Sequence, residues 1–98
     1  MKHAIAAIAL WATQATAEAD PCTSIGDLAE QMMTHRQAGT AISELMPLLD
    51  GNPLFIQMLL QAYQEPRFGT RDFQQREIED FRNLWETGCY QAMTEKGA

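Results

Sequence analysis

NPLFIQMLLQAY, residues 52–63, is the stretch that decides the fold of this chain. Asn52 followed by Pro53 is a typical helix start, because asparagine caps the first turn and proline is tolerated at the first helical position. Almost every following position is apolar, so the expected helix is apolar around much of its circumference. We therefore predict that it is the central and most buried helix, and that it ends before Pro66.

A first helix is predicted ahead of this stretch, at residues 24–38. Thr23 or Ser24 is a suitable N-cap, and Gly39 is a typical C-cap because glycine adopts the left-handed conformation without strain. One apolar stripe follows at helical spacing: Ile25, Leu28, Ala29 and Met32. Strand signals are almost absent, since no run of Val, Ile and Thr alternates with a period of two.

A short helix is predicted between these two segments, beginning after a Thr40 cap. Pro47 limits it, because a proline inside a helix removes a hydrogen bond and clashes with the preceding turn. Asp50-Gly51 is then expected to form a turn. Three side chains of this helix are expected to face inward: Ile42, Leu45 and Met46.

The longest helix is predicted after a Thr70 cap. Arg76 with Asp80, and Arg82 with Glu86, are spaced i, i+4 and are expected to pair. Six residues should share its buried face: Phe73, Ile78, Phe81, Leu84, Trp85 and Cys89. The predicted fold class is therefore all-α, a small bundle of three longer helices and one short helix.

The N-terminal residues predict export from the cytoplasm. A short basic start is followed by an uncharged run rich in Ala, Ile and Leu, and then by Ala15-Thr16-Ala17, which fits an A-x-A cleavage site. We predict that residues 1–17 are a cleaved signal peptide and that residues 18–98 form one helical domain, periplasmic or secreted. The alternatives are an N-terminal amphipathic or membrane helix, and a lipid anchor on Cys22, whose preceding residues match a lipoprotein signal poorly.

The mature chain is acidic and contains no predicted membrane span, since no apolar run approaches the roughly 20 residues that cross a bilayer. Of the 7 Lys and Arg residues, only Lys2 lies in the predicted signal peptide. The mature chain therefore has 6 basic residues and 13 Asp and Glu residues. This balance disfavours nucleic acid and anionic membrane surfaces as partners, because both bind through basic side chains.

Two cysteines, Cys22 and Cys89, lie near the two ends of the mature chain. A disulfide forms and persists in an oxidising compartment, so we predict that a Cys22–Cys89 bridge closes the domain. Two free thiols or an intermolecular bridge are the alternatives. A metal pair is not indicated, because the two residues do not form a C-x-x-C motif.

Several short motifs occur together along the mature chain: Cys22 with IGDLA at 25–29, RQAG at 36–39, AYQEPRF at 62–68, and Phe81 with Cys89-Tyr90. As a set they resemble a family of small exported helical proteins with two cysteines, found in proteobacterial and phage genomes. No activity is established for that family, so the resemblance assigns no functional residue. It implies an exported, helical, disulfide-closed domain.

No catalytic or cofactor motif is found in the sequence. Nucleophilic catalysis needs a Ser or Cys beside a base, and the single histidine of the mature chain, His35, has no evident carboxylate partner. Met32, Met33 and His35 lie on one predicted helix and are ligand types that hold copper. The competing explanation is that the methionines pack in the core and His35 is a surface residue. We predict no enzyme activity, no cofactor and no metal, and keep a copper carrier or an enzyme as less favoured alternatives.

YQEPRFGTRDF, residues 63–73, is the segment best suited to recognition. It gathers four residues of the types that anchor protein interfaces at one predicted loop: Tyr63, Arg67, Phe68 and Arg71. The competing explanation is local packing, with the two aromatic rings beneath the loop and Arg67 paired with Glu65 or a helix end. Both explanations stay open on the sequence.

The leading functional prediction is a small exported, non-enzymatic protein that binds another protein in the periplasm or envelope, as an inhibitor, immunity or accessory protein. The alternative is a periplasmic stress chaperone that exposes apolar surface at low pH. Its oligomeric state is left open.

Overall fold

The computed structural model describes residues 20–97, and every regular element in that part of the chain is helical. The elements are α2 (Pro21–Ala38), the short α3 (Ile42–Leu45), the 3-10 helix η1 (Met46–Leu49), α4 (Pro53–Gln64) and α5 (Arg71–Gly97). The all-α prediction is confirmed. The predicted signal peptide, residues 1–17, lies outside the described residues. None of the helices within 20–97 combines the length and the apolarity that a bilayer crossing requires.

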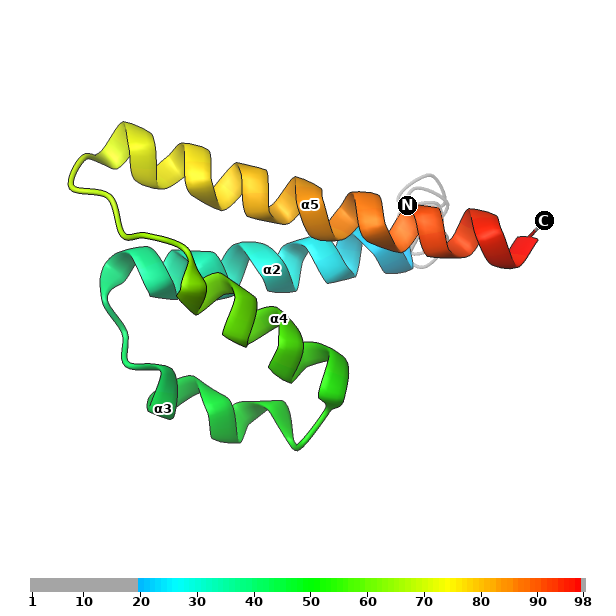
Figure 1. Ribbon diagram of the computed structural model, residues 1–98, viewed down its shortest axis with the longest axis horizontal. Helices are drawn as coiled ribbons and strands as arrows, with labels where there is room; N and C mark the ends of the chain where they lie inside the picture. Colours follow the sequence, from blue (N-terminus) through cyan, green and yellow to red (C-terminus); the bar gives the residue numbers. More distant parts are fainter. Residues whose placement is uncertain (1–19, 98) are drawn as a thin grey trace, which may run out of the picture.

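The central helix of the described chain is α2. In Figure 1, α5 runs antiparallel to α2 along one side, while α4 and α3 lie on the other side. The buried core is made by side chains of all three longer helices: Ala29, Met32 and Met33 from α2, Met58, Leu59 and Ala62 from α4, and Ile78 and Phe81 from α5. Unbranched methionines suit such a junction because they adapt to irregular gaps.

The prediction that residues 52–63 form the most buried helix is wrong. Leu54 and Leu60 of α4 are each 46% exposed. The reason is that the neighbours of α4, which are α2 and η1, leave Leu54 and Leu60 largely uncovered. Apolar residues around the whole helix therefore indicate only that any side of it could be buried. The helices that pack against it determine which side is covered.

The start of α2 differs from the prediction at Thr23 or Ser24. Asp20 is the N-cap, and its carboxylate accepts a hydrogen bond from the Cys22 backbone N–H at 2.9 Å. Pro21 then occupies the first helical position, where its missing N–H costs nothing. This is the same device as Asn52-Pro53 at the start of α4, with aspartate in place of asparagine.

The predicted turns and caps between the helices are largely confirmed. Gly39 ends α2 with φ 87°, in the left-handed region. Asp50 and Gly51 form the predicted turn, with φ values of 51° and 71°. The Asn52 side chain accepts hydrogen bonds from two amides of the first turn of α4, at 3.0 and 3.1 Å. Thr70 caps α5 as predicted, its hydroxyl accepting from the Phe73 amide at 3.4 Å.

The short predicted helix is divided in two. It begins at an Ala41 cap, whose N–H donates to the Glu44 carboxylate at 3.3 Å, so the predicted Thr40 cap is one residue too early. At Pro47 the chain continues as the 3-10 helix η1, because proline cannot supply the next α-helical hydrogen bond. The three side chains predicted to face inward are half-buried against the core, as expected: Ile42, Leu45 and Met46.

The buried face of α5 is narrower than predicted. Ile78 and Phe81 are buried and Trp85 is half-buried, but Phe73 and Leu84 are 51% and 54% exposed. This part of the prediction is wrong because α5 packs mainly on the single helix α2, which covers one stripe of its surface.

A disulfide between Cys22 and Cys89 joins the beginning of α2 to α5, as predicted, with Cα atoms 5.4 Å apart. The two helices approach closely beside it. Gly26 is buried there, and a Cβ atom added at this position would overlap the Glu86 side chain. The glycine therefore permits the short helix–helix distance near the bridge.

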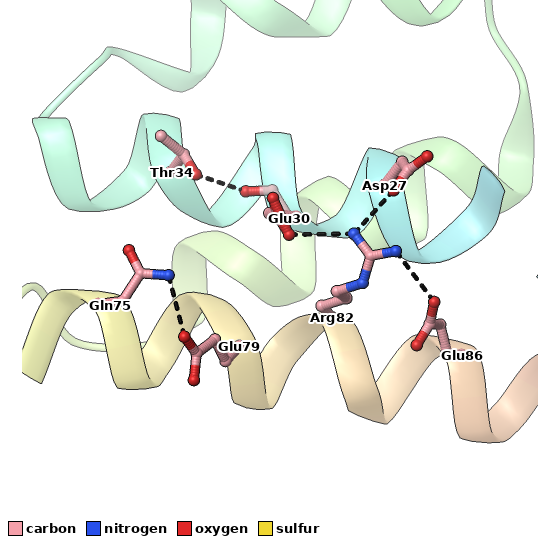
Figure 2. A network of polar contacts seen from close by, with 7 residues as sticks. All are labelled: Asp27, Glu30, Thr34, Gln75, Glu79, Arg82 and Glu86. Atoms are coloured by element: carbon pink, nitrogen blue, oxygen red, sulfur yellow. Dashed lines mark hydrogen bonds and ion pairs between the residues drawn. The ribbon is translucent and has the colours of Figure 1, made fainter. Parts of the chain in front are cut away.

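Arg82 forms the polar link between the same two helices. Figure 2 shows its guanidinium between Asp27 and Glu30 of α2 and Glu86 of α5, with N···O distances of 2.7, 3.0 and 3.2 Å. The predicted Arg82–Glu86 pair is confirmed. Arg76 does not pair with Asp80 in the described chain; its guanidinium lies 5.4 Å above the Phe73 ring.

Candidate functional site

The segment predicted for recognition is fastened to the end of α2. Tyr63 donates its hydroxyl to the Thr40 backbone oxygen at 2.6 Å, and the Arg36 guanidinium lies 5.4 Å above its ring. Arg36 also donates to the Glu65 backbone oxygen at 2.9 Å. Half-buried Phe68 lies beside Phe73, with ring centroids 5.9 Å apart. Both aromatic side chains therefore have structural partners within the chain.

The two arginines of this segment are exposed. The Nε of Arg67 donates to the Gln37 backbone oxygen at 3.4 Å, beside the left-handed Gly39. This contact with a helix end is the local-packing arrangement that the sequence left open. Arg71 begins α5. The interface prediction for Tyr63, Arg67, Phe68 and Arg71 stays a prediction, carried mainly by the two exposed guanidinium groups.

Gln37 is the residue that holds this loop, and the sequence reasoning missed it. Its side chain is 3% exposed. The amide nitrogen donates to the Pro66 backbone oxygen at 2.9 Å, and the amide oxygen accepts from the Phe68 backbone N–H at 2.9 Å. A single glutamine thus satisfies one acceptor and one donor of a loop that is distant in sequence. No local pattern around Gln37 indicates this role.

Replacing Gln37 by methionine should lower the free energy of unfolding by about 1–2 kcal/mol, because the Pro66 carbonyl and the Phe68 amide lose their partner. Chemical denaturation gives the energy, and hydrogen exchange at the Phe68 amide should quicken. Gln31→Met is the matched control, since Gln31 is an exposed residue of the same helix. Equal effects of the two substitutions would contradict the role given to Gln37.

An apolar groove opens beside the disulfide, where α2, α4 and α5 meet, and we call it the disulfide groove. Its volume is about 490 Å³. Its walls include Ile25 of α2, Leu54 and Gln61 of α4, and Leu84, Trp85 and Met93 of α5. Leu54, Leu84 and Met93 are 46%, 54% and 50% exposed. The groove therefore keeps large apolar side chains in contact with water.

Two residues that line the disulfide groove, Met93 and Trp85, have unusual surroundings. The Met93 sulfur lies 3.3 Å from the Cys22 sulfur, so the methionine packs directly on the bridge. The Trp85 indole nitrogen is buried and has no hydrogen-bond acceptor within the described residues. Leu84, Trp85 and Cys89 were predicted to be core residues, so the sequence identified the apolar stripe and missed that part of it stays open.

Three carboxylates, the carboxylate cluster, lie beyond one end of this groove: Glu65, Glu77 and Asp80. Glu65 follows Gln61 of the groove wall by four residues, and Asp80 and Glu77 precede Leu84 by one and two helical turns. Burial raises the pKa of Glu77, and repulsion from Glu65 and Asp80 raises it further. The cluster therefore gives this end of the groove a negative potential.

Replacing Glu77 by glutamine should stabilise the protein at pH 7 by a few tenths of a kcal/mol, because it removes a partly buried carboxylate that Glu65 and Asp80 also repel. The folded-state pKa lies above the ordinary 4.5, so the folded state binds the proton more tightly. Glu77 therefore lowers the free energy of unfolding least at low pH. The loss of stability appears as pH rises through the folded-state pKa of Glu77.

Denaturant unfolding of both proteins at pH 7 and pH 4 measures this difference, which should vanish at the lower pH. Glu79→Gln, on the same helix, is the control. A Glu77→Gln protein that is less stable than the native one at pH 7 would contradict the expected repulsion.

The residues considered for copper are separated by burial. Met32 is 4% exposed and belongs to the core, whereas His35 is exposed. A ring nitrogen of His35 lies 3.1 Å from the Thr40 hydroxyl oxygen, a contact at the end of α2. Within residues 20–97, no group of three or more His, Cys, Asp or Glu side chains is arranged to hold a metal ion.

Comparison with protein-family models finds no matching family, and comparisons with curated proteins and with solved structures find no significant match.

Proposed function

We propose that this chain is a small exported, non-enzymatic protein that binds another protein in the periplasm or envelope, as an inhibitor, immunity or accessory protein. The observation that carries the proposal is the disulfide groove, whose lining includes three half-exposed apolar side chains, Leu54, Leu84 and Met93. Exposed apolar surface rimmed by polar residues is typical of interaction sites.

Two further features support export and binding. The Cys22–Cys89 disulfide suits an oxidising compartment, where such bonds persist. It also fixes α5 against α2 beneath the groove, so the apolar surface is presented by a rigid scaffold. A preorganised surface binds more tightly than a mobile one, because less conformational entropy is lost on association.

Capture experiments with the exported, purified protein test this function. The immobilised protein should retain one dominant partner from a periplasmic extract of the source organism, and titration of the purified partner should give a saturable, stoichiometric complex. Leu84→Asp should weaken that complex at least about tenfold. Leu48→Asp is the matched control, since Leu48 is 72% exposed on η1 and lies outside the disulfide groove.

The same experiment separates the two candidate surfaces. Loss of binding in Arg67→Glu with Arg71→Glu, and not in Leu84→Asp, would move the interface to the loop at residues 63–71. A protein that retains no specific partner from extract of its own compartment would contradict the proposed function.

A stress chaperone is the second candidate, because seven large apolar side chains of the described chain are substantially exposed: Leu48, Leu54, Leu60, Phe73, Leu84, Tyr90 and Met93. Acid would weaken the contacts between α2 and α5. Hydrogen bonds from Tyr90 and the Cys22 amide lower the pKa of Asp20, so its stabilising effect is present above 3.8 and is lost as pH falls through the lowered value.

The chaperone candidate predicts that tertiary structure is lost near pH 3 and that the acid form suppresses aggregation of a client protein. Near-UV circular dichroism measures the first effect and light scattering of the client the second. A dichroism spectrum that is unchanged at pH 3 would remove this candidate.

A further inference from the structure

The disulfide groove has the length of a short helix contact. Its wall on α5 extends from Leu84 to Met93, which corresponds to about 14 Å along the helix axis. An occupying helix that presents apolar residues at i, i+3 or i+4, and i+7 spans about 10 Å with those residues. Apolar side chains from α2, α4 and α5 line this space, so an occupying helix would contact all three helices.

The chemistry of the groove favours an apolar occupant. No charged side chain is among the residues that line it, and Gln61 contributes the one amide. An occupant with a continuous apolar stripe would remove Leu54, Leu84 and Met93 from water. In helix-in-groove recognition, an amphipathic helix buries apolar side chains at i, i+3, i+4 and i+7 in a groove of this kind.

Charge decides which occupant fits. The chain has a formal net charge of −6, so two copies repel one another, and an anionic lipid headgroup is repelled in the same way. Asp80 and Glu77 of the carboxylate cluster lie one and two helical turns before Leu84 on α5. Arg82 of α5 is already paired with three carboxylates (Figure 2).

We propose that the disulfide groove binds an amphipathic helix of a partner protein, whose apolar residues contact Leu54, Leu84 and Met93 and whose Lys or Arg residues meet the carboxylate cluster. This inference rests on the proposed binding function and specifies the partner's chemistry. The partner is a cationic amphipathic segment, a second copy of the chain is disfavoured by like charge, and the apolar contacts supply the larger part of the affinity.

A designed peptide is the probe. It has about 18 residues, or five helical turns, with leucine at i, i+3, i+4 and i+7 spacing, lysine elsewhere and no tryptophan. In the mature chain, residues 18–98, Trp85 of the groove lining is the sole tryptophan and therefore serves as the fluorescent reporter. Two comparison peptides replace every lysine by glutamate, or keep the composition and scramble the order.

The lysine peptide should shift the Trp85 emission to shorter wavelength and saturate at one peptide per protein. Leu84→Asp and Leu54→Asp, one on each wall, should each weaken binding at least about tenfold, and the equally charged control Leu48→Asp should leave it unchanged. Each variant should remain folded, because the substituted positions are half exposed or more, and circular dichroism checks this.

The charge contribution has its own variant. Glu77→Gln combined with Asp80→Asn should weaken the lysine peptide about threefold to tenfold and flatten the dependence of its affinity on salt. The glutamate peptide and the scrambled peptide should bind at least about tenfold more weakly than the lysine peptide.

Four results would overturn the inference. The first is equal binding of the lysine peptide and either comparison peptide, and the second is equal binding by the Leu84→Asp and Leu48→Asp proteins. The third is a Trp85 shift with dodecanoic acid and none with the peptide, which would assign the groove to acyl chains. The fourth is a dimer in sedimentation that Leu84→Asp dissociates, which would assign it to a second copy.

Failure of this inference is distinguishable from failure of the proposed function. A natural partner that binds in a Leu84-dependent manner, together with a lysine peptide that does not bind, would leave the function standing and overturn the partner chemistry. Binding of the peptide without any partner captured from the periplasm would have the opposite meaning.

Discussion

Replacing both Cys22 and Cys89 by serine should lower the free energy of unfolding by about 4 kcal/mol, because the bridge closes a loop with a sequence separation of 67 residues. The bridge restricts the unfolded chain, and its loss raises the entropy of the unfolded state. A domain of this size has a net stability of only about 5–15 kcal/mol, so the change is a large part of the total. Urea denaturation without reductant measures it.

Reductant provides the matched control for the disulfide. Added to the native protein, it should produce a similar loss of stability, and added to the Cys22→Ser, Cys89→Ser protein it should have no effect. Two thiols that are freely alkylated in the native, exported protein would contradict the expected result, as would unfolding midpoints that coincide.

Replacing Leu59 by alanine should lower the free energy of unfolding by about 3 kcal/mol, because the side chain is fully buried and its removal leaves a cavity. Leu59 packs in the core with Met33 and Met58, whose side chains are also fully buried. The flexible methionines will fill part of the space, which places the cost below the upper end of the leucine-to-alanine range.

The neighbouring residue supplies the control for this substitution. Leu60 is the same residue type on the same helix, but it is 46% exposed, and Leu60→Ala should cost less than about 1 kcal/mol. Chemical denaturation of the two variants therefore compares burial alone. A larger loss for Leu60→Ala than for Leu59→Ala would contradict the observed orientation of α4.

Sequence reasoning predicted the features that depend on neighbouring residues. Asn52-Pro53 specifies the start of α4, Gly39 the end of α2 and Thr70 the start of α5, because caps act within a single turn. Asp20 was missed, although Asp20-Pro21 has the chemistry of Asn52-Pro53, since a hydroxyl residue downstream offered a competing cap.

The features that depend on distant residues were not predictable in the same way. Leu84 and Ile78 are both apolar residues of one stripe on α5, yet one is 54% exposed and the other buried. The difference depends on which side of α5 is covered by α2, because α2 contacts α5 both before and after Leu84, at Arg82 and at Cys89. Gln37 is similar: its hydrogen bond to Phe68 joins residues 31 positions apart, and nothing in its own segment indicates that the loop returns to it.

The position of the bridge also determines how the chain responds to pulling. Force applied to the two ends of the helical domain acts first on the disulfide. Cys22 lies at the start of α2, and few residues of α5 follow Cys89. The load then passes through the covalent link, and the part of the chain between Cys22 and Cys89 carries no tension. A degradation machine that threads substrates from the C-terminus must therefore draw in two strands together or stall until the bond is reduced.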